Sequence, residues 1–490
     1  MEDIRKHFTY KEKLIFEKSQ VGKKGISFTD PLPNYKLPKN KRENFEDIPS
    51  LSENEVVRHF VRLSNVNFSV DTGFYPLGSC TMKYNPKINE KISLFDTFVN
   101  SHPYLDEDFV QGNLKLMYLL QDALSEITGL SGVTLQPAAG AHGEFTGMQI
   151  IKAYHEDHNT GKDTVLIPDT AHGTNPASAA MAGLKVKSIK VSEKGFLEID
   201  DLKDKIDENT AALMVTNPNT IGIFEEQLIE ISELLHKKGA LLYGDGANLN
   251  ALMGIAKAKD LGIDVMHINL HKTFSTPHGG GGPGAGPVVV SDKLKEYLPV
   301  PVVEYKNNRY FLNYDYPKTI GKVKDFYGHF GVMVKALVYI MSLGGEGLKK
   351  VSETAVLNAN YIREKLKDYY ELPFSTPSMH EVVFNDEKQQ KYGISTMDIA
   401  KGLIDKGFHP PTVYFPLVVK AAIMIEPTET ESKESLDTFI DAMIEISKEA
   451  EKNPEKLHNA PSNTIVNRLD EVKAARHPVL KYSSTDSQDN

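Results

Sequence analysis

Lys272 is the residue of this 490-residue chain whose surroundings best suit covalent chemistry. The mainly apolar run 265–270 predicts a buried strand, and His271 and Lys272 follow it directly. A lysine at such a place either reaches water or loses its proton and becomes a nucleophile. A glycine-rich run follows at 279–286, where the backbone can pass close to a bound group. Lys272 is therefore a candidate Schiff-base lysine beside a cofactor, and the alternative is a surface lysine next to a flexible loop.

Small or polar residues also follow other predicted strands. Gly140, Ala141 and His142 open a helix after the first strand, and the free N–H groups of a helix N-terminus attract phosphate. His172 follows the second strand, where it could stack on an aromatic ligand or only cap a helix. Asn217 follows the fourth strand, where it could donate to a ligand oxygen or only shape a turn. Each pattern is weak when it is taken alone.

Asp245 directly follows the fifth apolar run. A buried carboxylate is costly unless a cation accompanies it, and the protonated nitrogen of a pyridine ring is such a cation. Asp245 and Lys272 are separated by about one helix and one strand. Together with the strand-end residues above, they describe a site for pyridoxal 5′-phosphate (PLP). In that site Lys272 binds the cofactor carbonyl, Asp245 faces the ring nitrogen, His172 stacks on the ring, and residues 140–142 bind the phosphate.

Strand-like and helical runs alternate between residues 131 and 345. The expected strands are 133–136, 164–168, 186–191, 211–216, 240–243, 265–270 and 287–291. This alternation predicts an α/β fold with a mostly parallel, doubly wound sheet and helices on both faces. In such a sheet, ligands bind at the carboxyl ends of the strands, so the candidate residues should meet at one edge.

The chain is expected to have five parts. Residues 1–60 form an extended arm with a short helix beginning at residue 53, and 61–130 form loops and a helix that line the site. Residues 131–345 form the large cofactor-binding domain. Residues 346–482 form a small α+β domain, and 483–490 are a polar tail.

Composition limits the classes of function. The net charge of −10 argues against nucleic-acid binding, and no Cys/His cluster has the spacing of a metal site. One cysteine permits no intrachain disulfide, which is typical of a reducing compartment. The apolar run 326–344 is interrupted by His329 and Lys335, so it predicts a buried helix rather than a membrane span. We expect a cytoplasmic protein that binds neither membrane nor nucleic acid.

Long segments of the chain carry a family resemblance. They are VDTGFYPLGSCTMK (70–83), AHGTNPASA (171–179), TNPNTIGIFE (216–225), YGDGANLNA (243–251), NLHKTFSTPHGGGGPG (269–284), PKTIGKVKDFYGHFG (317–331), HPPTVYFPL (409–417) and IEPTETESKE (425–434). With these segments, the chain resembles the glycine decarboxylase (P-protein) family of the glycine cleavage system, within the fold-type I PLP enzymes. The resemblance runs from about residue 14 to about residue 482.

The resemblance implies an activity and partners. The chain is about half as long as single-chain P-proteins, so it resembles the PLP-bearing subunit 2 of the split form. Such an enzyme is an oxidoreductase that acts on CH–NH2 groups with a disulfide acceptor. It decarboxylates glycine and transfers the aminomethyl group to the lipoyl arm of H-protein. The implied assembly is a heterotetramer of two such subunits and two copies of P-protein subunit 1, for which residues 1–60 are a candidate contact.

The resemblance also adds candidate site residues. Thr319 matches a family position expected to contact the cofactor phosphate across a subunit boundary. Ala247 and His271, close in sequence to Asp245 and Lys272, join the candidate cofactor-binding residues.

Ser79, Cys80 and Thr81 are candidate substrate-site residues because they lie within the PLGSCTMK segment. A thiol near a site that handles a disulfide suggests redox chemistry. We favour a packing role for Cys80, since a free cysteine behaves mostly as a small buried apolar residue.

Two alternatives remain open. Another fold-type I enzyme, such as an aminotransferase, an amino-acid decarboxylase or a serine hydroxymethyltransferase-like protein, would share the same cofactor site. Aminotransferases usually hold the substrate carboxylate with an arginine of the small domain, and Arg363 is the one arginine between residues 346 and 460. A non-catalytic subunit would be expected to lack Lys272 or Asp245, and both are present.

Overall fold

The computed structural model describes residues 12–27, 39–40, 48–279 and 284–480. The chain forms two compact units: Phe74–His458, and Met1–Gly73 together with Asn459–Asn490. The five-part division expected from the sequence remains a prediction. Parts of the predicted arm, residues 280–283 of the glycine-rich run and the tail from residue 481 lie outside the described residues.

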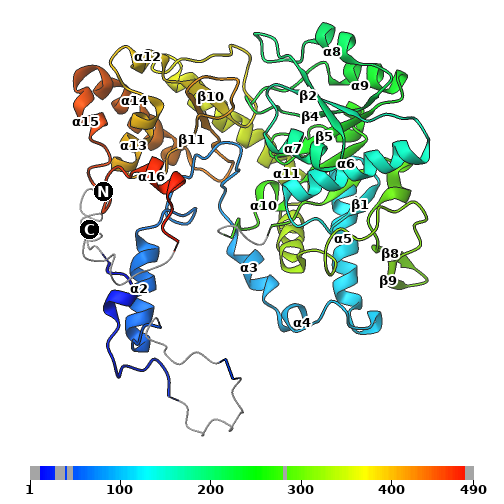
Figure 1. Cartoon of the computed structure of the whole chain (residues 1–490), viewed down its shortest axis with the longest axis horizontal. Coiled ribbons are helices and arrows are strands. Elements are labelled where there is room, and N and C mark those ends of the chain that lie inside the picture. Colours follow the sequence, from blue (N-terminus) through cyan, green and yellow to red (C-terminus); the bar gives the residue numbers. More distant parts are fainter. Residues whose placement is uncertain (1–11, 28–38, 41–47, 280–283, 481–490) are drawn as a thin grey trace. The chain divides into compact units, whose positions relative to one another are not determined.

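A seven-stranded sheet dominates the larger unit (Figure 1). Its spatial order is β1 (Gly132–Thr134), β7 (Val288–Val290), β6 (Val265–Ile268), β5 (Leu241–Gly246), β4 (Thr210–Thr216), β2 (Thr164–Pro168) and β3 (Lys185–Ile189). Strands β3, β2, β4, β5 and β6 run parallel to one another. Strand β7 is antiparallel to both of its neighbours, β6 and β1. The predicted mostly parallel sheet is confirmed, and each of the seven expected runs contains a strand.

Helices cover both faces of this sheet, as the sequence predicts. On one face lie α6 (Gly140–Asp157) and α7 (Thr174–Met181); on the other lie α5 (Gln111–Thr128), α8 (Ile199–Lys205), α9 (Leu228–Lys237) and the first half of α11 (Phe330–Leu366). Side chains of β4 alternate between the faces: Met214 packs with the α6 side, and Leu213 and Val215 pack with the α11 side. This alternation decides which strand-end residues can reach the site.

The strand before Lys272 is shorter than predicted. Strand β6 ends at Ile268, and Leu270–Thr273 form a single helical turn, α10, after Asn269. The backbone N–H groups of Lys272 and Thr273 both donate to the Asn269 carbonyl, which closes the turn. Lys272 therefore lies on a short helix at the carboxyl edge of the sheet, not at the end of the strand itself.

Helix α11 continues from the large sheet into a second core. Its 37 residues bend at Gly344, where φ is +61°. Val334 and Ala336 are fully buried; Ala336 packs in the sheet core, and Ile362 and Leu366 lie in the core of the C-terminal region. By length and composition alone, α11 is long and apolar enough to cross a membrane. Core helices of soluble proteins often have the same length and composition.

The C-terminal region of the larger unit is an α+β layer, as predicted. Its antiparallel sheet has the order β10 (Val382–Asn385), β12 (Ala422–Ile425) and β11 (Thr412–Val413). The helices packed with it are α12 (Glu387–Gln390), α13 (Thr396–Asp405), α14 (Lys433–Lys452) and α15 (Pro454–His458).

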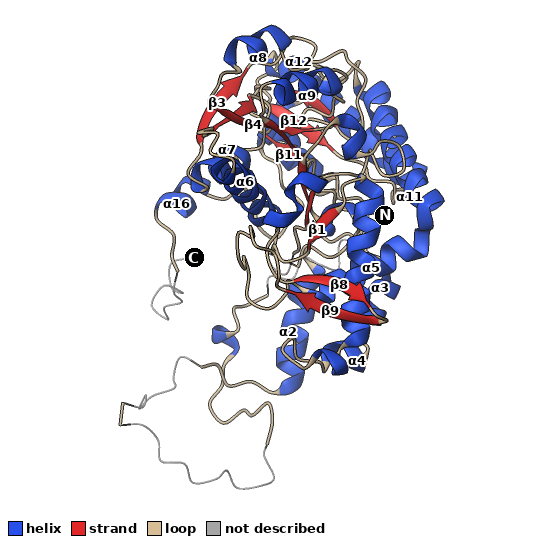
Figure 2. Cartoon of the chain, turned by 90° about the vertical axis from the view of Figure 1, so that its right-hand side faces the viewer, coloured by secondary structure: helices blue, strands red, loops and turns tan. Residues whose placement is uncertain are grey.

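Shorter elements complete the larger unit. They are α3 (Lys87–Ser93), α4 (Asp96–Val99), the 3₁₀ turns η3 (Glu107–Phe109), η4 (Ala258–Leu261) and η5 (Asp292–Tyr297), and the hairpin of β8 (Val302–Lys306) and β9 (Arg309–Asn313) (Figure 2). The hairpin packs against α5.

The smaller unit contains few elements. These are η2 (Phe16–Lys18), α2 (Glu53–Asn65) and α16 (Glu471–Arg476). Helix α2 begins with a capping box between Ser52 and Glu55, which confirms the helix start expected in the arm. Glu12 accepts hydrogen bonds from His59 at 2.9 Å and from Arg62 at 3.3 Å, which ties the first described residues to this helix.

Candidate active site

Asp245 is the buried acid at the end of β5, with 3% of its surface exposed. Its Oδ2 accepts from Asn175 Nδ2, and its Oδ1 accepts from the Ala247 N–H, both at 2.9 Å. Burial alone would raise the pKa of Asp245, but His267, Asn175, the Ala247 N–H and Lys272 together lower it. Asp245 therefore keeps a negative charge where the sequence predicts a partner for a ring nitrogen.

His267 joins Asp245 and was not identified from the sequence. Its Nε2 lies 3.4 Å from Asp245 Oδ1, and its Nδ1 lies 2.8 Å from the Tyr243 hydroxyl. The parallel register of β5 and β6 places His267 opposite Asp245, so both side chains lie on the same face. Side chains alternate between the two faces of a strand, and this alternation within residues 265–268 could have placed His267 on the face of Asp245.

Lys272 is half-buried on α10. Its charge acts on the Asp245 carboxylate, on the Cys80 thiol and on His278. Its neighbour His271 is half-buried, and burial together with His278 and Lys272 lowers the pKa of His271 to about 4. His271 is thus neutral at physiological pH.

The turn 138–143 lies beside the Lys272 helix. A side chain at Gly140 would meet Asn269 at 2.6 Å, and one at Gly284 would meet His271 Nδ1 at 3.1 Å and Ala138 O at 3.3 Å. The His142 ring accepts a hydrogen bond from the Ala138 N–H at 3.1 Å. Glycine is therefore required where the turn 138–143 and the segment at Gly284 approach Asn269 and His271. The first N–H groups of the 18-residue α6 belong to the same turn.

His172 lies exposed at the start of α7. Its Nδ1 lies 2.8 Å from Thr174 Oγ1 and accepts from the Thr174 N–H, and Thr174 Oγ1 donates to Glu144. Its ring meets Phe415 edge-on at 5.4 Å. These contacts fit the capping alternative and leave stacking on a cofactor as a prediction.

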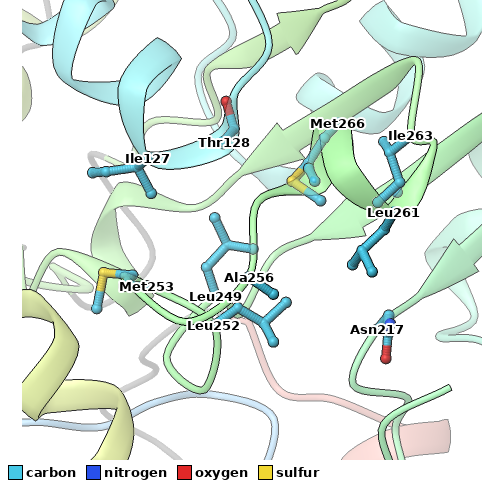
Figure 3. A pocket seen from close by; sticks show the side chains of 12 residues that line it. Ile127, Thr128, Asn217, Leu249, Leu252, Met253, Ala256, Leu261, Ile263 and Met266 are labelled. Carbon is cyan, nitrogen blue, oxygen red and sulfur yellow. The ribbon is translucent and has the colours of Figure 1, made fainter. Parts of the chain in front are cut away.

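Thr216, rather than Asn217, shares the face of Asp245. Strand register places Thr216 opposite Asp245, and its buried Oγ1 has no hydrogen-bond partner among the described residues. Asn217 Oδ1 accepts from the Glu225 N–H at 2.9 Å, so this side chain shapes the turn. Asn217 also lines an apolar pocket with Leu249, Leu252 and other residues of the opposite core (Figure 3). The structure does not bring Asn217 to Lys272.

Thr319 is likewise not brought to Lys272 within this chain. Its hydroxyl donates to the Leu298 carbonyl at 2.5 Å and accepts from the Gly321 N–H at 3.1 Å. These bonds hold a turn after β9. Its contact with a phosphate across a subunit boundary stays a prediction.

The loop with Ser79, Cys80 and Thr81 lies close enough to Lys272 for the lysine charge to act on the Cys80 thiol. Ser79 and Thr81 have φ values of +63° and +50°, which are rare outside glycine and need support from neighbours. That support comes from two buried acids: Glu381 Oε2 accepts from the Ser79 N–H and Glu426 Oε2 from the Thr81 N–H, each at 2.9 Å. Neither glutamate was identified from the sequence, because each lies about 300 or more positions from the loop.

Cys80 is a free cysteine near Lys272, Glu381 and Glu426. Burial raises the pKa of Cys80; Lys272 lowers it, and Glu426 and Glu381 raise it further. A protonated thiol is a poor nucleophile. The site therefore fits the predicted packing role better than a redox role.

Lys83 anchors the end of the same loop. With 2% of its surface exposed, it donates to Glu429 at 2.9 Å, to Asn250 at 2.8 Å and to the Tyr339 hydroxyl at 3.1 Å. This buried cluster ties the loop to β12, α11 and the segment after β5. The sequence contained Lys83 in a family-like segment but offered no sign of its partners.

The residues around Lys272 fit PLP. Five buried polar atoms that have no hydrogen-bond partner among the described residues lie next to Lys272 in sequence or beside Asp245 in the fold: Thr216 Oγ1, Asn175 Oδ1, His271 Nδ1, Thr276 Oγ1 and His278 Nε2. A polar aromatic ligand would use such atoms. Asp245 suits a ring nitrogen, Lys272 a carbonyl, and the glycine cradle at α6 a phosphate.

Glu144, Asp245 and His267 also present ligand atoms within 4.8 Å of one another. Glu144 accepts from Thr174 and Ser178, and Asp245 and His267 have the partners given above. Each of the three is thus held by its own hydrogen bonds, and His267 Nε2 faces Asp245 at 3.4 Å without a hydrogen-bond partner among the described residues.

Comparisons with known proteins agree with this site. Residues 351–468 match the family described as glycine dehydrogenase, C-terminal domain, and residues 144–302 match aminotransferase class-V. The crystal structure of glycine decarboxylase (P-protein) of the glycine cleavage system, in inhibitor-bound form, is 20% identical, with a TM-score of 0.70 over 84% of this chain and 93% of that chain. A glutamate decarboxylase of Lactobacillus brevis follows with a TM-score of 0.63 at 14% identity, covering 86% of this chain and 96% of that one. These likenesses establish the fold-type I architecture of PLP enzymes.

Curated relatives are much more similar in sequence. The protein named "Probable glycine dehydrogenase (decarboxylating) subunit 2" of Caldanaerobacter subterraneus subsp. tengcongensis is 56% identical over 478 residues, which cover 96% of this chain and 98% of that protein. The protein of the same name from Listeria welshimeri is 55% identical over 480 residues, with the same coverage. The chain therefore belongs to the family of glycine dehydrogenase (decarboxylating) subunit 2 proteins.

Proposed function

We propose that this chain is the PLP-bearing subunit of an enzyme that decarboxylates glycine and transfers the aminomethyl group to the lipoyl disulfide of H-protein. The observation that carries the proposal is 56% identity across 96% of the chain to a glycine dehydrogenase (decarboxylating) subunit 2, together with Lys272 and Asp245 at one sheet edge. A subunit 2 implies a separate partner, which we propose to be P-protein subunit 1 in a two-plus-two heterotetramer in the cytoplasm.

The cofactor supplies a ring that accepts the electron pair left when CO2 departs. Lys272 would hold the cofactor carbonyl through its Nζ. Asp245, whose charge is stabilised by Asn175 and His267, keeps a proton on the ring nitrogen. The N–H groups at the start of α6 would bind the cofactor phosphate.

The partners of Arg363, the one arginine between residues 346 and 460, support decarboxylation over transamination. Arg363 donates to the Ser375 carbonyl at 2.9 Å and to Glu364 at 2.7 Å, away from Lys272. A carboxylate held by a strong cation is stabilised against loss of CO2, whereas one in a less polar setting is not. Buried apolar and weakly polar groups near Lys272, including Cys80, favour the second situation.

Cofactor attachment tests the proposal. The chain is co-expressed with P-protein subunit 1, supplied with PLP and reduced with borohydride, and its peptides are weighed. We expect the added cofactor mass on the peptide that contains Lys272, and none in a Lys272→Ala variant. Lys257→Ala, which removes a surface lysine paired with Glu126, is the matched control and should retain the mass.

Activity is measured on the same preparations. Release of labelled CO2 from carboxyl-labelled glycine should require both subunits, PLP and lipoylated H-protein. Conversion of a keto acid to an amino acid at the expense of glycine, without CO2, would instead identify an aminotransferase and contradict the proposal.

A further inference from the structure

Two buried glutamates near Lys272 have no part in the chemistry described above. Glu381 directly precedes β10 and Glu426 directly follows β12, with 2% and 0% of their surfaces exposed. Both hold the loop that contains Ser79 and Thr81. Burying two carboxylates costs free energy, and neutral side chains could hold a loop without that cost.

The two carboxyl groups have different surroundings. Glu426 accepts from the Thr81 N–H at 2.9 Å, from Thr81 Oγ1 at 2.7 Å and from Asn248 Nδ2 at 2.7 Å. Three donors favour the ionised form. Among the described residues, the Glu381 carboxyl accepts one hydrogen bond, from the Ser79 N–H, and its Oε1 lies 3.9 Å from His380 Nε2. Two neighbouring buried carboxyls resist double ionisation, so the proton belongs to Glu381.

The charged and titratable groups around Glu381 agree with this assignment. Burial and the charge of Glu426 raise the pKa of Glu381 well above its usual range, and the Ser79 N–H and Lys272 lower it by less. Burial lowers the pKa of His380, so that side chain is neutral and adds no cation. Cys80, which Glu381 and Lys272 both influence, lies on the same loop. Glu381 is thus a neutral acid beside the reactive lysine.

The proposed reaction consumes one proton. The electron pair of the broken bond to CO2 forms a bond from the glycine carbon to one sulfur of the disulfide. The S–S bond breaks, its electron pair goes to the second sulfur, and that thiolate needs a proton to leave as a thiol. The disulfide is thereby reduced and the glycine carbon oxidised, so no other redox partner is required.

We propose that Glu381 donates this proton to the sulfur released from the disulfide acceptor. Glu381 becomes a carboxylate in this step and recovers its proton from water before the next turnover. Glu426 holds Thr81 through two hydrogen bonds, which makes it a positioning residue. The inference rests on the proposed function, because it requires a disulfide as the acceptor.

Single-turnover measurements separate the proton donor from the loop anchor. Glu381→Gln keeps an oxygen for the Ser79 N–H but has no acidic proton. We expect CO2 release to change less than about tenfold, while the appearance of the free thiol on lipoylated H-protein slows by about 10²- to 10⁴-fold, the range for a lost general acid. Glu381→Asp, which keeps an acid, should restore part of the rate. Glu233→Gln, which removes an exposed carboxylate that pairs with Lys237 at 3.9 Å, should leave the thiol step unchanged.

An infrared measurement detects the proton on the Glu381 carboxyl without any turnover. At neutral pH, the assembled complex should show a carbonyl band of a protonated, buried carboxyl that Glu381→Gln removes. Glu426→Gln is not expected to remove this band. The thiol step of the wild type should be flat from acid to neutral pH, and that of Glu381→Gln should slow as the pH rises.

The outcomes distinguish this inference from the proposed function. A wild-type complex that releases no CO2 from glycine would overturn the function. Normal CO2 release with an unchanged thiol step in Glu381→Gln would overturn the inference alone. If Glu381→Gln does not fold, the spectrum is taken on a Glu431→Gln complex, because the pKa of Glu431 is also raised, to about 7. In that complex, no protonated-carboxyl band at neutral pH would overturn the inference, and a band that titrates only above neutral pH would support it.

Discussion

At the scale of single residues, the site depends on a few polar groups that are stable only because of their neighbours. Asp245 remains ionised at 3% exposure because Asn175, the Ala247 N–H and His267 surround it. The same local chemistry keeps His271 and Cys80 uncharged. A single substitution should therefore change the charge state of the site without changing the fold.

Asp245→Asn tests this dependence. The amide keeps the shape and can still bond to Asn175 after a flip, but it cannot hold a proton on a ring nitrogen. We expect PLP to remain bound while the rate of CO2 release falls by about 100-fold or more, the size of effect seen when one electrostatic group is removed. Absorbance spectra and labelled-glycine assays measure both quantities.

The matched control for that substitution is Asp163→Asn. Asp163 forms an exposed pair with Lys185 at 2.7 Å, and pairs of this kind contribute little to stability. An equal loss of rate in both variants would mean that Asp245 has no special role at the ring.

At the scale of the element, strand alternation decides which of two adjacent residues faces the cofactor. Thr216 lies opposite Asp245, whereas Asn217 lies on the other face of the sheet. Thr216→Val removes a hydroxyl at nearly constant volume. It should weaken PLP binding by about 1 kcal/mol, or roughly fivefold in Kd, and shift the absorbance of the bound cofactor.

Asn217→Ala should have the opposite pattern. Its Oδ1 holds the Glu225 N–H, so the variant should lower the melting temperature and leave the cofactor absorbance unchanged. A spectral change in Asn217→Ala together with none in Thr216→Val would contradict the assignment of faces.

The segment after β12 carries a pH-dependent contribution to stability. Burial and the charge of Glu429 raise the pKa of Glu431 to about 7, and Ser435 lowers it less. A raised folded pKa means that its contribution is fully present below the ordinary value of 4.5 and is lost as the pH rises through about 7. The wild type should therefore be less stable at pH 8 than at pH 5 on account of this group.

Glu431→Gln removes that titration. At pH 8 we expect the variant to be more stable than the wild type by about 2 kcal/mol, after allowance for the partial exposure of the side chain. At pH 4 the two should unfold together. Urea unfolding at both pH values measures the difference, and an identical difference at both would exclude the titration of Glu431 as its cause.

At the scale of the whole molecule, the larger unit exposes apolar side chains between α3 and α5. Leu94, Phe95, Val99 and Phe109 are 67%, 49%, 52% and 81% exposed. Exposed apolar groups that follow one another in this way are typical of contacts with a partner. They agree with the proposal that the chain works with a second subunit.

Phe95→Asp tests this contact. The charged side chain should lower the affinity for P-protein subunit 1 by at least tenfold, because a desolvated carboxylate at an interface is costly. The folded chain alone should keep its melting temperature, since Phe95 is half-exposed. Sedimentation of the mixed subunits measures the assembly, and Ile229→Asp, on the exposed side of α9, is the control.

The sequence by itself determined the elements and the fold class, and it singled out Lys272 as the candidate reactive lysine. Apolar runs alternating with amphipathic helices are local patterns, and they predicted the seven strands and the parallel sheet. Asp245, Lys272 and the glycine turn at residue 140 were recognisable because each directly follows such a run. Local patterns carry this information because they reflect which face of an element is buried.

Tertiary structure alone decided which side chains support the site. Glu381 and Glu426 meet the 79–81 loop across 302 and 345 positions of sequence, and no local pattern encodes such a contact. Strand register and neighbouring loops also decide where three other side chains lie. They place Thr216 on the face of Asp245, His172 at a helix cap and Thr319 in a turn. The physical reason is that burial and hydrogen bonding depend on what folding brings together, not on which residues are adjacent in the chain.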